Sequence, residues 1–148
     1  MQTFNPPPPD LRAHDRFMKL LFFIMIFSVG LYALALAFIP QSATPMSGDM
    51  IIGLGICAVA SALVVLFLRF NKIESLLIPD PPTPIAERLA KLRVYFIVCY
   101  VFSEAVALWG FVLRFMGARV IDVVPFFAGA LILDALCYPR LPSDVEGK

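Results

Sequence analysis

The sequence predicts an all-α integral membrane protein, a four-helix bundle with both termini in the cytoplasm. Three features predict it: the composition, four long apolar runs, and an uneven distribution of basic residues. Of the 148 residues, 60% are hydrophobic, and the mean hydropathy is +0.85. Soluble domains are roughly 45–50% apolar, so this excess indicates that lipid, rather than water, surrounds most of the chain.

The four apolar runs are each long enough to cross a bilayer as a helix, because about 20 residues suffice. Polar segments separate them, so we expect one membrane domain over residues 17–140. Thr83 and Pro84 are a typical N-cap and first-turn pair, which predicts that the third helix begins before its membrane span. The expected segments are a Pro-rich cytoplasmic tail at 1–16, spans at 17–39, 50–70, 94–116 and 121–138, a cytoplasmic loop at 71–93, and a cytoplasmic tail at 141–148.

The basic residues set the expected orientation. With the N-terminus inside, the inner side holds all of the 12 Lys and Arg residues except Arg114 and Arg119. An excess of Lys and Arg marks cytoplasmic loops, so both termini are expected in the cytoplasm and the protein in the bacterial inner membrane. The formal net charge of +1 indicates no affinity for nucleic acid or acidic substrates.

No residue pattern for catalysis or cofactor binding appears in the sequence. Cys57, Cys99 and Cys137 lie in apolar runs without metal-ligand spacing, so we expect small buried hydrophobic residues rather than metal ligands. His14, the only histidine, is expected on the surface beside the first span. With no nucleophile–base pair and no phosphate-binding loop, the sequence predicts a non-enzymatic protein without a cofactor.

Small residues at helical spacing predict close contacts between helices. Such residues let helix backbones approach one another within a membrane. A pore lining is the alternative interpretation of the stripe in the second span. The predicted packing positions are Gly30 in the first span, Gly53, Gly55, Cys57 and Ser61 in the second, and Gly110 in the third.

Glu104 is the main candidate for a functional site. It lies about ten residues from each end of the third span, near the expected bilayer midplane. An ionisable residue at that depth is costly and is by default a functional-site hypothesis. Tyr100 and Ser103 are its expected local partners. Two interpretations stay open: a carrier of protons or sodium ions, and a hydrogen-bonded group that holds helices together.

Asp134 is a second carboxylate, in the fourth span and nearer the inner face. It and Glu104 are both ion-binding candidates. The two carboxylates can flank one cavity, act as steps of a relay, or face different neighbours, because the sequence does not fix the rotation of the helices. Arg114, near the outer end of the third span, is expected to extend outward or to pair with Asp122.

The segment Glu104-Ala105-Val106-Ala107-Leu108-Trp109-Gly110 resembles the carboxylate-bearing helix of the ATP synthase c-type proteolipid. Lys91-Leu92-Arg93 before it is similar to the basic start of that helix, and Gly53-x-Gly55 to the family's glycine-rich first helix. The resemblance covers about residues 50–116 and implies that Glu104 binds the transported proton or sodium ion. The chain departs from the family in its long Pro-rich connection and in two further spans.

Two functions are therefore expected. The first is a non-enzymatic accessory or assembly subunit of a larger membrane complex, in contact with lipid and with other subunits or copies of itself. The alternative is a proton- or sodium-carrying, proteolipid-like subunit or small transporter that uses Glu104.

Overall fold

The computed structural model describes residues 11–39, 48–78 and 84–140, and nearly all of them are helical. In the described residues there is no β-strand. The elements are α1 (Leu11–Leu36), α2 (Gly48–Leu68), the π-helical η1 (Arg69–Ile73), α3 (Glu74–Leu77), α4 (Ile85–Phe115) and α5 (Val120–Leu136).

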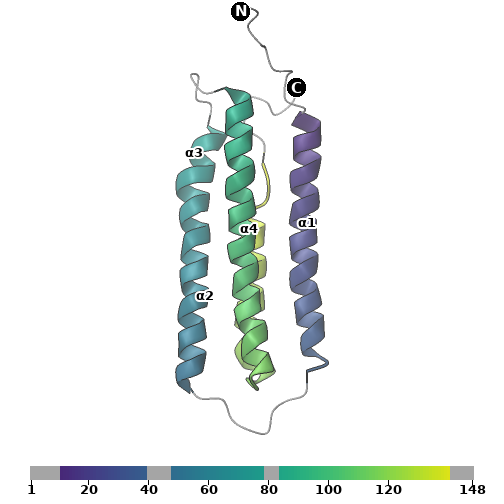
Figure 1. The fold of residues 1–148 in the computed structure, drawn as a ribbon, viewed down its shortest axis with the longest axis vertical. Coiled ribbons are helices and arrows are strands. Elements are labelled where there is room, and N and C mark those ends of the chain that lie inside the picture. The colour runs from purple at the N-terminus through teal and green to yellow at the C-terminus, as the bar shows by residue number, and fades with distance from the viewer. Residues whose placement is uncertain (1–10, 40–47, 79–83, 141–148) are drawn as a thin grey trace, which may run out of the picture.

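The four long helices lie side by side, with α4 in the middle (Figure 1). Helices α1 and α2 lie on opposite sides of α4, and α5 packs behind it. Helix α4 contacts every other long helix, whereas α2 packs chiefly on α4. In the most apolar stretch, 44% of α4 is buried, against 17% for α1 and 11% for α2. The fold is therefore built around α4, and α1 and α2 present most of their surface outward.

Three helices are long and apolar enough to cross a membrane. They are Leu11–Leu36, Gly48–Leu77 and Ile85–Phe115, and an 18-residue stretch within each has a mean hydropathy of 2.2, 2.8 and 2.0, respectively. Large apolar side chains point outward on each, as lipid contact requires. Helix α5 has 17 residues, which is about 26 Å at 1.5 Å per residue, at the lower limit for a membrane span.

Helix bounds differ from the expected spans at the cytoplasmic side. Helix α1 starts at Leu11, so the described part of the predicted tail, 11–16, is helical. The helix that begins at Gly48 continues through η1 and α3 to Leu77, which shortens the expected loop. Helix α4 begins directly after Pro84. Residues 1–10, 79–83 (with the predicted N-cap Thr83) and 141–148 lie outside the described residues.

Two arginines bind backbone carbonyls at the helix ends on this side. The last carbonyls of a helix have no partner within it, so an outside donor is needed. Arg69, at the start of the π-helical turn, donates from Nε to the Leu136 carbonyl at 2.9 Å, at the end of α5. Arg88 donates from Nη2 to the carbonyls of Leu76 and Ile78, each at 3.0 Å. These contacts fix the ends of α3 and α5 against their neighbours.

Arg114 has the same role at the opposite end, which corrects the expectation from the sequence. It is buried and donates to the carbonyls of Ala118 at 3.0 Å and Ile39 at 2.8 Å. Asp122 instead binds Arg119, with an Nε–Oδ2 distance of 3.0 Å. The expected outward extension or pairing with Asp122 was wrong, because the carbonyls that close α1 and the α4–α5 turn lie within reach of the guanidinium.

His14 is buried, not on the surface as expected. Helix α1 begins early enough to press this side chain against α4, where His14 Nδ1 lies 3.3 Å from Arg93 Nη2. The Arg93 guanidinium also stacks over the Phe17 ring, 5.1 Å from its centroid. Such cation–π contacts stabilise by about 0.5–1 kcal/mol at exposed sites. The start of α1 is thereby held to α4.

Gly110 allows α4 and α5 to approach closely. A Cβ atom at this position would lie 2.6 Å from Cβ of Phe126 on α5, closer than real Cβ contacts. Ser61 is also inward-facing and donates to the Cys57 carbonyl at 2.9 Å. By contrast, nothing described lies within 4 Å of a Cβ built at Gly30, Gly53 or Gly55. Among the described residues, Gly30 and Gly53 therefore touch no neighbouring helix, while Gly55 lines an open groove that faces α4 and α5.

Substituting Gly110 with alanine is expected to destabilise the protein. The added methyl group collides with the part of Phe126 nearest its backbone, so α4 and α5 must separate, and such overpacking costs about 1–3 kcal/mol. Gly53→Ala is the matched control, since it makes the same change on a helix face with open space around it. The free energy of unfolding in detergent, measured for both variants, checks this. Equal stability of the two variants would contradict the close α4–α5 contact.

Candidate functional site

Glu104 links α4 to α1. Its Oε1 accepts hydrogen bonds from the hydroxyls of Ser28 and Tyr32, the latter at 3.0 Å. Ser28 and Tyr32 are four residues apart, so they lie one above the other on the same face of α1. The Tyr32 ring packs on Phe111 of α4, with the centroids 5.8 Å apart. Glu104 itself is half-buried, about three turns before the end of α4.

Two hydroxyl donors on one carboxyl oxygen suit either state of Glu104. An ionised carboxylate accepts both bonds, and a protonated one still accepts them at Oε1 while its proton sits on the other oxygen. The two hydrogen bonds are therefore compatible with the ion-carrying interpretation of the sequence. It is equally a polar contact between α1 and α4, which is one of the interpretations left open by the sequence.

The expected partners of Glu104 bind elsewhere. Tyr100 donates from its hydroxyl to the carbonyl of Cys137, and Ser103 to the carbonyl of Ala130, both at 2.9 Å. Both acceptors are on or just after α5. Tyr100 and Ser103 are three residues apart and share the face of α4 that packs on α5, whereas Glu104 turns to α1. The partnership predicted from sequence was therefore wrong, because the rotation of α4 directs these side chains to different helices.

Asp134 lies in the interface of α4 and α5. Its side chain is 1% exposed, and neither of its carboxyl oxygens has a hydrogen-bond partner among the described residues. The Ser103 hydroxyl is close to Asp134 but donates its single proton to Ala130. Glu104 is near enough to act on Asp134 electrostatically. The two carboxyl groups thus lie on different sides of α4 and have different neighbours.

Two buried thiols lie beside Asp134. Cys99 and Cys137 are adjacent and fully buried, and no disulfide joins them. The Cys99 sulfur lies 4.0 Å from the Val65 carbonyl oxygen. Cys57, in contrast, is exposed on α2. Within the described ranges, no three His, Cys, Asp or Glu side chains are grouped so that they could hold a metal ion.

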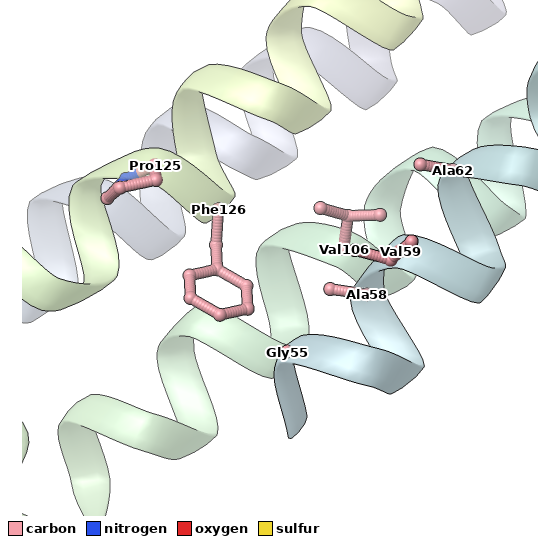
Figure 2. Close-up of a pocket in the computed structure, with 7 residues that line it drawn as sticks. All are labelled: Gly55, Ala58, Val59, Ala62, Val106, Pro125 and Phe126. Carbon is pink, nitrogen blue, oxygen red and sulfur yellow. The ribbon is translucent and has the colours of Figure 1, made fainter. Parts of the chain in front are cut away.

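Two grooves of the described structure are apolar, and neither is lined by Glu104 or Asp134. One, of about 270 Å³, lies where small residues of α2 face Val106 of α4 and Phe126 of α5 (Figure 2). A larger one, of about 410 Å³, lies between Ala33 and Ala37 of α1 and Val124 of α5. Neither groove is lined by a charged residue, so each suits an acyl chain or an apolar side chain rather than a polar ligand.

Ser28 and Tyr32 are the residues that the sequence-based prediction missed. The available signal was their spacing: two hydroxyl side chains one turn apart in an otherwise apolar helix. In comparisons with protein-family models, curated proteins and solved structures, none matches this chain. Its function is therefore inferred from its own residues.

Removing the Tyr32 hydroxyl is expected to weaken the contact between α1 and α4. In a double-mutant cycle of Tyr32→Phe with Glu104→Met, we expect a coupling free energy near 0.6 kcal/mol, the average for hydrogen bonds between membrane helices. Unfolding in detergent measures it. Tyr138→Phe, which removes a hydroxyl from a half-exposed tyrosine, is the control and should show no coupling with Glu104. Zero coupling for Tyr32 would contradict the hydrogen bond.

Proposed function

We propose that this protein is a non-enzymatic accessory or assembly subunit of a larger membrane protein complex. The observation that carries the proposal is the outward face of α2. Gly53 and Cys57 are exposed one turn apart, and nothing described lies within 4 Å of a Cβ built at Gly53. Small residues on a membrane helix favour close packing by another helix. Since no helix of the described residues covers that face, a helix of another subunit is the occupant that it suits.

The proposed topology is four spans with both termini in the cytoplasm of a bacterial inner membrane. The start of α1 and the end of α5 lie at the same end of the bundle (Figure 1). Nine described basic residues belong to that end, against two at the other, which supports a cytoplasmic position. The nine are Arg12, Arg16, Lys19, Arg69, Lys72, Arg88, Lys91, Arg93 and Arg140. The length of α5 is sufficient for a fourth span at the lower limit.

A bulky residue at Gly53 is expected to remove the protein from its complex without unfolding it. After extraction in mild detergent, the wild-type chain should co-purify at fixed stoichiometry with larger, unrelated subunits, and Gly53→Leu should lose them. Gly48→Leu is the control, because Gly48 is equally open but lies at the start of α2 and outside the stripe. The mass and composition of each particle give the result. A wild-type chain that purifies alone would contradict the accessory role.

A second candidate function is a proton- or sodium-carrying subunit that uses Glu104. The half-buried carboxyl group inside an apolar helix, with two hydroxyl donors from α1, favours it. The resemblance of the Glu104 segment to the c-type proteolipid points the same way. In that case the partner on the α2 face is a second copy, and the particle is a ring of this chain.

Glu104→Gln distinguishes the two functions. If Glu104 carries the ion, proton or sodium flux through the intact particle in liposomes should fall to background, because an amide does not bind and release a proton. If the protein is an accessory subunit, the activity of the complex should persist in this variant, with at most weaker assembly. Glu87→Gln, at the exposed start of α4, is the control for a change of one charge. Flux that survives Glu104→Gln would exclude the carrier function.

A further inference from the structure

Asp134 is the one fully buried carboxylate among the described residues, and it has no hydrogen-bond partner there. Asp15 binds Lys19, Glu87 binds Lys91 and Asp122 binds Arg119. Asp134, by contrast, is the most deeply buried of the described charged side chains, and both of its oxygens lack a hydrogen-bond partner. Such a group calls for a ligand, because a buried charge without partners is one of the costliest features that a fold can contain.

The polar groups around Asp134 do not neutralise it. From α4, Tyr100 and Ser103 lie close by, but Tyr100 donates its hydroxyl proton to the Cys137 carbonyl and Ser103 donates its own to the Ala130 carbonyl. Cys99 and Cys137 are uncharged thiols, and Glu104 adds a like charge when it is ionised.

Arg69, the cation beside the two thiols, is engaged elsewhere. Arg69 donates to the Leu136 carbonyl, and its remaining charge faces Glu74 with a closest distance of 3.8 Å. It makes no hydrogen bond to Asp134. The charge balance of the α4–α5 interface therefore leaves the carboxyl group to be neutralised by a bound ligand.

We propose that Asp134 is a proton-binding site, held at neutral pH as a carboxylic acid sealed between α4 and α5. A proton is the ligand that fits the geometry, because neither of the two apolar grooves reaches Asp134. A sodium ion needs several oxygen ligands around it, whereas a proton needs one oxygen. The accessory function does not require such a site, so the proposal goes beyond it and does not depend on it.

Infrared spectroscopy of the full chain in liposomes tests the proposal. At neutral pH we expect a carbonyl-stretching band of a protonated carboxyl group that is lost in Asp134→Asn. Asp122→Asn makes the same chemical change at a carboxylate paired with Arg119 and should leave the band intact. Asparagine has nearly the volume of a neutral aspartic acid, so the fold should survive the change. Loss of the band in neither variant, or in both, would overturn the proposal.

Two further measurements keep the result decisive if Asp134→Asn does not fold. In the wild-type chain, the band should shift when the protein is labelled with ¹³C-aspartate and stay in place with ¹³C-glutamate. A band that responds only to glutamate labelling would assign the proton to Glu104 and overturn the proposal. Sodium-dependent thermal stabilisation of the wild-type chain, measured in parallel with lithium and potassium, would show a metal cation as the ligand and would also overturn it.

Discussion

The constraint behind this structure is that a polar group in hydrocarbon must find its partner inside the protein. The arginines illustrate it. Arg69, Arg88 and Arg114 direct their guanidinium groups onto carbonyls at helix ends, where the helix leaves them without partners. Between α4 and α5, the buried hydroxyls of Tyr100 and Ser103 likewise donate to backbone carbonyls. The helix ends and the α4–α5 interface are thus joined by side chain–backbone hydrogen bonds.

This constraint also explains why α4 is the central helix. It carries polar groups on two faces: Glu104 toward α1, and Tyr100 with Ser103 toward α5. On the α5 side, the absence of a side chain at Gly110 brings the two backbones close enough for those hydroxyls to reach carbonyls. Helix α2 forms fewer polar contacts and is held mainly by apolar packing. The outward surface of α2 therefore contributes least to the contacts between the described helices.

The sequence predicted the positions of the long helices, because the residue patterns that mark a helix are local. Apolar length predicted the long helices, Pro84 predicted the start of α4, and the depth of Glu104 singled it out. Rotation about the helix axes could not be predicted, since apolar residues surround α1 and α2 on all sides and give no periodicity. For that reason Ser28 and Tyr32 were missed, and Tyr100 and Ser103 were assigned to the wrong carboxylate. Arg114 was misplaced because its acceptors are backbone atoms, which a sequence does not display.

Glu104 and Asp134 differ in whether the fold alone explains their presence. Glu104 has hydroxyl partners on another helix, so its presence is explained by the attachment of α1, whatever else it does. Asp134 has no partner, so packing does not explain it; an apolar residue of similar size would fill the α4–α5 interface at lower cost. Arg69 and Arg114 each donate at least one hydrogen bond to a backbone carbonyl, whereas neither oxygen of Asp134 has a hydrogen-bond partner among the described residues. That difference points to Asp134 as a place where something binds.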